Sequence, residues 1–128
     1  MDENGTFIWN ELIATDQKKS GSFYSELFGW QRKEVDAGPF GTYTIFQQDG
    51  KDIAGMMNPT IEYTKKLGDR WYGYVAVDDI DVHSTRAKKL GGTIIAGPDD
   101  IPGVGRVCLI IDPGGAPVRL MQPIREAR

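Results

Sequence analysis

The sequence has only one cysteine and one histidine in 128 residues, and each of these low counts limits the classes of protein to which the chain can belong. A single cysteine excludes an internal disulfide and is typical of a reducing compartment, so we expect a cytoplasmic protein. No apolar run approaches the roughly 20 residues of a membrane-spanning helix, and no charged-then-apolar signal segment opens the chain. The 15 basic and 18 acidic residues are well mixed and give a net charge of −3. We therefore expect neither a membrane nor a nucleic acid as a partner.

The chain carries an internal repeat with an offset of about 62 residues. A strand-like stretch ends at Asp16 and again at Asp78, and a glycine follows thirteen positions later in both copies, at Gly29 and Gly91. A repeated strand–helix unit predicts two similar half-sheets that must associate, because neither can bury its apolar face alone. A chain of this length is expected to form one compact domain, residues 1–128.

Turn and helix-end signals divide both halves in the order β-α-β-β-β. Asp16 is expected to cap the first helix, and Asp78 or Asp79 the second, because an aspartate side chain accepts from the open amides of a first helical turn. Asp49-Gly50 is a strong two-residue hairpin signal. The expected modules are 5–58 and 70–123, an α+β architecture. In the first module we expect strands 6–14, 30–35, 42–48 and 51–57 with a helix 17–28, and in the second strands 71–77, 93–96, 106–111 and 116–122 with a helix from 78 or 79 to 90.

Alternation along three strands separates two kinds of side chain, since neighbouring strand residues point to opposite faces. One face is small or aliphatic, as expected beneath helices: Leu12, Ala14, Val75, Val77, Val118 and Leu120. The other face mixes aromatics with a carboxylate and a guanidinium: Trp9, Glu11, Ile13, Tyr72, Tyr74, Ala76, Pro117, Arg119 and Met121. The second face has the chemistry of a binding surface.

Four segments carry a family resemblance: 23–30 (FYSELFGW), 77–81 (VDDID), 101–106 (IPGVGR) and 112–116 (DPGGA). With the repeated element order, they make the chain similar to the vicinal oxygen chelate superfamily of glyoxalase I, bleomycin resistance proteins and extradiol dioxygenases. Within it, the branch of predicted lactoylglutathione-lyase-related proteins is most similar. The resemblance implies two β-α-β-β-β modules forming a curved mixed β-sheet cup with helices packed outside. It also implies a homodimer, and leaves open whether the cup forms within one chain or across two.

Enzymes of that superfamily hold a divalent metal with His, Glu or Gln side chains from four cup-facing strands. The resemblance puts the four ligand positions at Trp9, at Gly55 or Met56, at Tyr72 and at Arg119. None is a credible ligand, because such metals need imidazole, carboxylate or thiolate donors. His83 is interpreted as a partly buried structural histidine of the second helix. We therefore expect no metal site and no other cofactor.

Glu11 and Arg119 are the candidate catalytic residues of the cup face. They form either a structural ion pair, in which each residue compensates a charge that would otherwise be buried unpaired, or an active pair. In the active pair, Arg119 binds an anionic oxygen and Glu11 accepts a proton. The candidate ligand-binding residues are Trp9, Tyr43, Met56, Tyr72, Tyr74 and Met121. The aromatics among them are either core and dimer packing or a flat wall for a ring-containing ligand. Cys108, within an apolar run, is interpreted as a small core residue.

These residues favour a metal-free protein that binds an aromatic or anionic small molecule. A metal-independent lyase or isomerase is the alternative, with Glu11 as base and Arg119 or Tyr72 stabilising an oxyanion. A glyoxalase-type metalloenzyme ranks third, and a purely structural or interaction protein remains open.

Overall fold

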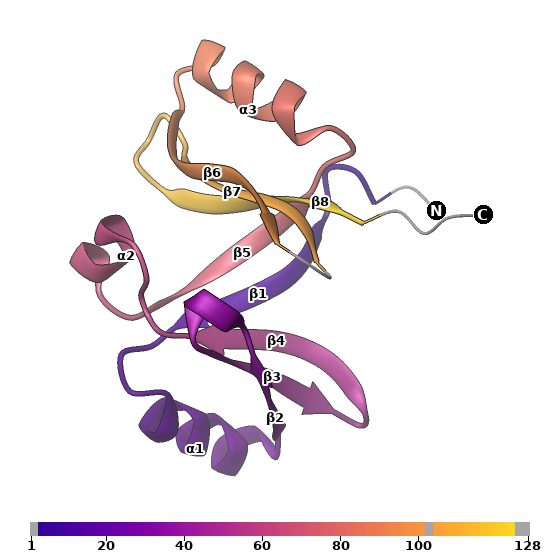
Figure 1. Ribbon diagram of the computed structural model, residues 1–128, viewed down its shortest axis with the longest axis vertical. Helices are drawn as coiled ribbons and strands as arrows, with labels where there is room; N and C mark the ends of the chain where they lie inside the picture. The colour runs from indigo at the N-terminus through magenta and orange to yellow at the C-terminus, as the bar shows by residue number, and fades with distance from the viewer. Residues whose placement is uncertain (1–2, 102–103, 125–128) are drawn as a thin grey trace. The chain divides into compact units, whose positions relative to one another are not determined.

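The computed structural model describes residues 3–101 and 104–124. These residues form eight strands, three α-helices and one short 3-10 helix (Figure 1). They fall into two compact units. The first unit is Trp9–Tyr72, and the second unit is Met1–Ile8 together with Gly73–Arg128.

The first unit contains a four-stranded mixed sheet in the order β2-β3-β4-β1. β1 runs parallel to β4, and the pairs β2–β3 and β3–β4 are antiparallel. Asp49 and Gly50 both have positive φ in the β3–β4 turn, at 53° and 76°, which is the geometry of a tight hairpin turn. The elements are β1 (Phe7–Ile13), α1 (Gln17–Phe28), β2 (Gln31–Asp36), the 3-10 helix η1 (Gly38–Phe40), β3 (Thr42–Gln48), β4 (Lys51–Met57) and α2 (Glu62–Leu67).

Helix α1 begins and ends where the sequence predicts. Asp16 Oδ1 accepts from the Lys19 amide at 3.0 Å and caps the helix. Gly29 ends it with φ at 77°, a left-handed conformation that costs glycine little. Beneath α1 lies a buried cluster made of Leu12, Ala14, Phe46, Ala54 and Met56, with Tyr24, Trp30 and Ile53 packed against it. This cluster is the core of the first unit.

The second unit contains a four-stranded mixed sheet in the order β5-β8-β7-β6. β5 runs parallel to β8, and β8–β7 and β7–β6 are antiparallel. Val77, Ile80, Cys108 and Leu120 form its buried cluster. Asp79, rather than Asp78, caps α3, since its carboxylate accepts from the Val82 amide at 3.2 Å. The elements are β5 (Arg70–Ala76, which belongs to this unit from Gly73 onward), α3 (Ile80–Lys89), β6 (Thr93–Ile101), β7 (Gly105–Ile111) and β8 (Pro117–Pro123).

The expected α+β fold with two β-α-β-β-β modules is confirmed, and the bounds of α1, β3 and β4 match. Two features differ. The connection after β4 contains α2, and β6 continues to Ile101, where a loop from 97 to 105 was expected. α2 is only six residues long, with Ile61 at its N-cap making no side-chain cap bond, so the sequence gives no start signal.

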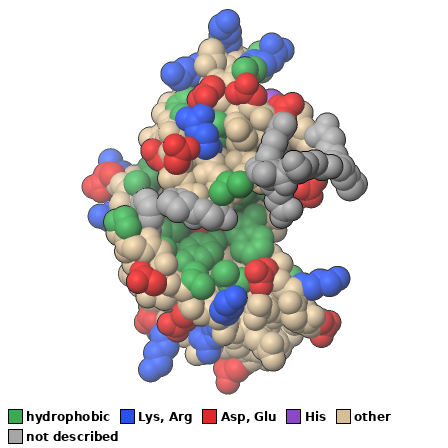
Figure 2. Space-filling model, turned by 45° about the vertical axis from the view of Figure 1, so that its right-hand side comes forward, with side chains coloured by type: hydrophobic (Ala, Val, Ile, Leu, Met, Phe, Trp, Pro, Cys, Tyr) green, Lys and Arg blue, Asp and Glu red, His purple; other side chains and the backbone are tan. Residues whose placement is uncertain are grey.

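The surface carries both signs of charge. On the face drawn in Figure 2, Lys and Arg side chains lie interspersed with Asp and Glu. No helix among residues 3–101 and 104–124 is long and apolar enough to cross a membrane.

Candidate functional site

The alternation predicted for β1 holds in the first unit. Leu12 and Ala14 lie in the cluster beneath α1, so Trp9, Glu11 and Ile13 lie on the opposite face of the sheet. Glu11 is buried, with 3% of its surface exposed, and it lies beside Gly55 of β4 in the sheet register. On the other side of Gly55 is Ile45 of β3. A carboxylate on this face is thus flanked by a residue without a side chain.

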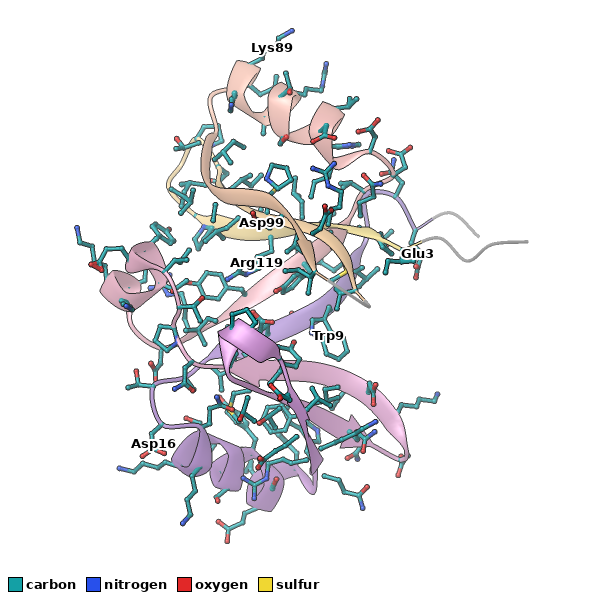
Figure 3. The ribbon with its side chains drawn as sticks, in the orientation of Figure 1. Glu3, Trp9, Asp16, Lys89, Asp99 and Arg119 are labelled. Carbon is teal, nitrogen blue, oxygen red and sulfur yellow. The ribbon has the colours of Figure 1, made fainter. Side chains whose placement is uncertain are left out.

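Trp9 and Tyr43 meet on this same face of the first unit. Trp9 Nε1 donates a hydrogen bond to Tyr43 Oη at 3.0 Å, and Figure 3 shows Trp9 on β1. The Tyr43 ring lies over Gly55, because a Cβ built there would overlap the hydroxyl and the ring carbons next to it. The phenol therefore occupies the space that a side chain at position 55 would need.

Met56 is placed on the wrong face by the sequence analysis. It pairs with Leu12 in the register of β4 with β1, which puts both residues beneath α1. Only 1% of its surface is exposed. Of the two alternatives at the fourth strand, Gly55 is the residue that shares a face with Glu11. Tyr72, at the end of the first unit, is also almost fully buried, at 1% exposed.

In the second unit, Tyr74 and Arg119 are neighbours across β5 and β8. The Arg119 guanidinium carbon lies 5.8 Å from the centre of the Tyr74 ring, within cation–π range. Met121 pairs with Ala76 on this face, whereas Val75 and Leu120 face the α3 side. Tyr74, Arg119 and Met121 thus share one face, as predicted. Because Glu11 and Arg119 belong to different units, their action as a pair stays a prediction.

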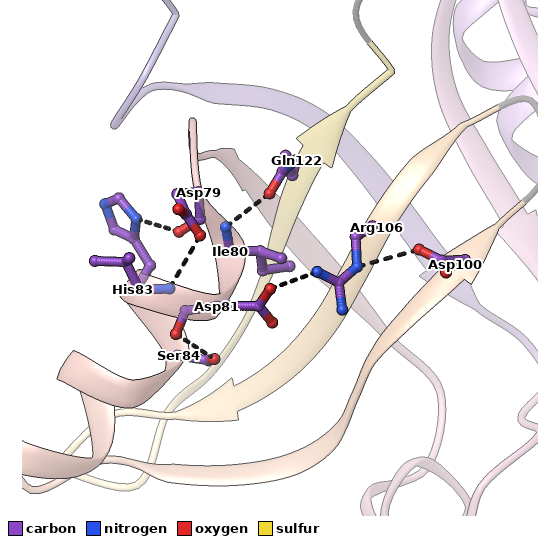
Figure 4. A network of polar contacts seen from close by, with 9 residues as sticks. Asp79, Ile80, Asp81, His83, Ser84, Asp100, Arg106 and Gln122 are labelled. Carbon is purple, nitrogen blue, oxygen red and sulfur yellow. Dashed lines mark hydrogen bonds and ion pairs between the residues drawn. The ribbon is translucent and has the colours of Figure 1, made fainter.

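A network of polar contacts at the start of α3 was missed by the sequence analysis (Figure 4). Arg106 Nη1 donates to Asp81 Oδ2 at 2.6 Å, and Arg106 Nε lies 3.1 Å from Asp100 Oδ1. The hydrogen bond to Asp81 raises the pKa of Arg106. Gln122 Oε1 accepts from the Ile80 amide at 2.9 Å and so joins β8 to the first turn of α3.

An open hollow of about 460 Å³ adjoins this network. Two carboxylates already hold the charge of Arg106, so the network ties α3 to β6 and β7 and offers little attraction to a further anion. The segment 101–106 contains Arg106, but in the sequence analysis it serves only as a mark of the family resemblance. The residues lining the hollow are Asp100, Ile101, Gly105, Arg106, Gln122, Pro123 and Ile124.

Cys108 is confirmed as a core residue, 1% exposed and part of the cluster beneath α3. Burial raises the pKa of its thiol from 9.0 to about 11. A thiol with so high a pKa carries almost no thiolate at neutral pH, and the thiolate is the reactive form. Cys108 is therefore unsuited to nucleophilic catalysis.

The residues at the four expected ligand positions do not fit a divalent-metal centre. Gly55 offers no side-chain donor atom, and the space beside it is filled by Tyr43. The indole of Trp9 is a donor only, and the guanidinium of Arg119 would repel a cation. Within the described ranges 3–101 and 104–124, no three His, Cys, Asp or Glu side chains are grouped to hold a metal ion.

Comparison with known proteins identifies the family of this arrangement. Residues 7–120 match the model of the Glyoxalase/Bleomycin resistance protein/Dioxygenase superfamily. CFP32 of Mycobacterium tuberculosis, provisionally called a glyoxylase, is 32% identical over 123 residues, which cover 96% of this chain and 46% of CFP32. The anthracycline biosynthesis protein DnrV of Streptomyces peucetius is 34% identical, over 88% of this chain and 45% of DnrV. The chain thus spans about half the length of these relatives.

Solved structures share the fold at much lower sequence identity. Methylmalonyl-CoA epimerase of Mycobacterium tuberculosis superposes with a TM-score of 0.66 at 16% identity, over 98% of this chain and 93% of the epimerase. A variant of the Streptomyces coelicolor epimerase gives 0.68 at 14% identity, over 97% and 100% of the two chains. The superfamily model covers nearly the whole chain, from residue 7 to residue 120. The chain belongs to the glyoxalase/bleomycin resistance protein/dioxygenase superfamily.

Proposed function

We propose that the chain is a small-molecule-binding member of this superfamily that contacts an aromatic or anionic ligand with its own side chains, without a metal ion. Each unit contributes one contact surface to the proposal, and each surface has its own test. In the first unit the surface is the Trp9–Tyr43 pair. In the second unit it is Arg119 with Tyr74 and Met121.

The Trp9–Tyr43 hydrogen bond over Gly55 carries the proposal. A phenol that accepts an indole N–H is held in one orientation, and the bond polarises the phenol's own O–H. Rigid aromatic side chains also lose little conformational entropy when they bind. An oriented phenol beside an indole can recognise an oxygen atom and a flat ring of one ligand, where metal-dependent relatives would use an ion.

Arg119 supports the anionic part of the proposal. Its planar guanidinium can donate two parallel hydrogen bonds to a carboxylate, phosphate or enolate. The Tyr74 ring, 5.8 Å away, helps to hold that plane in place. Met121, on the same face, is a flexible apolar wall that adapts to different ligand shapes.

Thermal shift measurements and calorimetry with named probes test the proposal. The probes are an anthracycline, chosen because two relatives are named for anthracycline biosynthesis, and benzoate as a minimal aromatic anion. Binding should raise Tm progressively with probe concentration, as mass action requires. Tyr43→Phe should weaken binding, and the matched control Tyr63→Phe, on α2, should not. If neither probe nor a wider set of aromatic acids and dicarbonyls raised Tm, the proposal would be wrong.

A second pair of variants tests whether Arg119 contacts the anion. Arg119→Lys keeps the charge but loses the two-pronged hydrogen bonding, so affinity for benzoate should fall about tenfold. Arg86→Lys, on the exposed side of α3, is the control and should leave the affinity unchanged. An equal effect of both substitutions would show that Arg119 is not the anion contact.

A metal-independent lyase or isomerase is the second candidate, and the buried Glu11 favours it. The Glu11 carboxylate, 3% exposed on the face of the sheet opposite α1, can act as a base toward a ligand held against that face. General-base catalysis contributes roughly 10² to 10⁴ in rate. Glu11→Gln should then abolish turnover of a dicarbonyl or other substrate and leave its binding intact, whereas Glu26→Gln should change neither. Turnover that persisted in Glu11→Gln would exclude this mechanism.

A further inference from the structure

Asp99 adds a negative charge to the face of the second unit that carries Arg119. Asp99 pairs with Val107 of β7, and Val107 pairs with Met121 of β8, so these three side chains lie on one face of the sheet. Met121 shares that face with Arg119, two residues before it on β8. The face therefore carries a carboxylate on β6 and a guanidinium on β8, and both residues are labelled in Figure 3.

The next residue, Asp100, lies on the opposite face and has a structural partner. Its carboxylate is 3.1 Å from Arg106 Nε, and Arg106 also donates to Asp81 of α3. Asp100 is thus held in the network on the α3 side of the sheet. By contrast, no hydrogen bond or ion pair ties the Asp99 carboxylate to residues 3–101 or 104–124. The Asp99 carboxylate is therefore available to a ligand.

The internal repeat indicates that the fold does not need a charge at this position. Val107 of the second unit corresponds to Tyr43 of the first, because each lies two residues before the residue that pairs with the expected ligand position of β8 or β4. Tyr43 pairs with Val35 of β2, and Val107 pairs with Asp99 of β6. An apolar residue thus stands in the first unit where the second has a carboxylate, so the carboxylate calls for a functional explanation.

The distance between Asp99 and Arg119 is one that a small molecule can span. β6 and β8 lie on either side of β7, about 10 Å apart, and the two residues differ by two positions along the strands, so their Cα atoms are about 12 Å apart. Val107 and Leu109 of β7 lie between them on this face and are apolar. The pKa of the Cys108 thiol is raised mainly by burial, is lowered by Arg119 and is raised by Asp99, which agrees with two opposite charges near the middle of β7.

We propose that Asp99 accepts a cationic group of the ligand, so that the second unit selects an aromatic molecule that carries both a positive and a negative charge. The inference rests on the proposed function, in which Arg119 binds the anionic group. A protonated amine has the fitting chemistry, because it donates charge-assisted hydrogen bonds to a carboxylate. Since Asp99 is exposed, it contributes modestly to affinity and acts mainly by discriminating between ligands of similar shape.

Calorimetry of the whole chain with two benzoates of similar shape tests the inference. 4-(Aminomethyl)benzoate carries an ammonium group, and 4-ethylbenzoate carries a methyl group in its place. The measured quantity is the ratio of the two affinities, because the shared benzoate part cancels in that ratio. Added salt should move the ratio toward 4-ethylbenzoate, since the charge pair at Asp99 is exposed and is screened.

Substitutions at Asp99 identify the group that meets the ammonium. Asp99→Asn keeps the size of the side chain and removes its charge, so the ratio should move about three- to fivefold toward 4-ethylbenzoate, the effect of one exposed charge pair. Asp99→Lys replaces attraction by repulsion and should move the ratio further in the same direction. Asp100→Asn, at the neighbouring position on the opposite face, is the matched control and should leave the ratio unchanged. Unchanged circular dichroism melts establish that the variants are folded.

Arg119→Lys separates this inference from the proposed function, because it should weaken the binding of both compounds alike. An Asp99→Asn variant with the wild-type ratio, or an Asp100→Asn variant with an equal shift, would overturn the role of Asp99 while 4-ethylbenzoate still bound. If the wild type bound neither compound, the proposed anion contact and the role of Asp99 would both be wrong.

Discussion

The hydroxyl of Tyr43 lies over Gly55, at the place where a side chain on that residue would begin. The two residues lie on neighbouring strands of the first unit, and Trp9 fixes the phenol by donating to it. A tyrosine thus fills a position at which the superfamily resemblance expects a donor side chain. This face of the sheet therefore carries an oriented hydroxyl group at the position where the superfamily resemblance implies a metal-binding atom.

Gly55→Ala should destabilise the protein by about 1–3 kcal/mol, the usual range for adding a group to a filled space. Because the added methyl group overlaps a rigid ring, Tyr43 must swing away and give up its bond to Trp9. Chemical denaturation measures the stability, and the indole fluorescence of Trp9 reports the lost contact when Trp30 and Trp71 are replaced by Phe in both proteins. In a Tyr43→Ala background the same Gly55→Ala change should cost much less. An equal cost in both backgrounds would mean that the ring does not occupy this space.

Cys108 should make stability fall at alkaline pH. Burial raises the pKa of its thiol from 9.0 to about 11, so above pH 9 the unfolded chain releases this proton before the folded chain does. The contribution is fully present below pH 9 and is lost as the pH rises to about 11. A difference of about two pKa units corresponds to about 2–3 kcal/mol.

The pH dependence of Cys108→Ala provides the comparison, because tyrosines and lysines also titrate in this range. The variant has no thiol, so its free energy of unfolding should fall less steeply than that of the wild type between pH 9 and 11. Parallel curves for the two proteins would show that the thiol ionises as easily in the folded chain as in the unfolded one.

Asp69 should stabilise the first unit through Thr15. Its carboxylate accepts from the Thr15 amide at 3.0 and 3.1 Å and from the Thr15 hydroxyl at 2.8 Å. These bonds join the end of the α2 connection to the residue just before the α1 cap. Asp69→Ala should cost about 1–2 kcal/mol, because hydrogen bonds to a charged group are stronger than neutral ones. Glu62→Ala, at an exposed position of α2, should cost far less in the same denaturation experiment.

The fold was predictable wherever a local signal and the wider pattern agreed. Asp16 and Gly29 marked both ends of α1, and Asp49-Gly50 marked the β3–β4 turn. α2 lacks such signals, and β6 continues through Gly97 and Pro98, two residues that ordinarily end a strand. Antiparallel pairing of Asp99, Asp100 and Ile101 with β7 keeps that segment in the sheet across a register shift after Ala96, which no local sequence signal reveals.

Alternation along a strand predicts on which face of the sheet a site residue lies, but it does not predict which residue of the neighbouring strand lies beside it. Alternation alone put Glu11 and Arg119 on the faces opposite the helices, and the structure agrees. Met56 was misplaced because the apolar residues of β4 do not alternate clearly with polar ones, so only the pairing with Leu12 decides its face. The Tyr43–Gly55 relationship depends on a diagonal contact between strands, which a single sequence does not reveal.

The sequence left Asp78 and Asp79 as equal candidates for the α3 cap, and their substitutions should separate them. Asp79 Oδ1 accepts from the Val82 amide at 3.2 Å, so Asp79→Ala should cost about 1 kcal/mol. The Asp78 carboxylate lies 3.9 Å from Nδ1 of the partly exposed His83, and an exposed pair of this kind contributes little. Asp78→Ala should therefore leave the free energy of unfolding within about 0.5 kcal/mol of the wild type. If the two variants were equally destabilised, the cap would be shared between the two carboxylates, and the single bond from Asp79 would not account for where α3 begins.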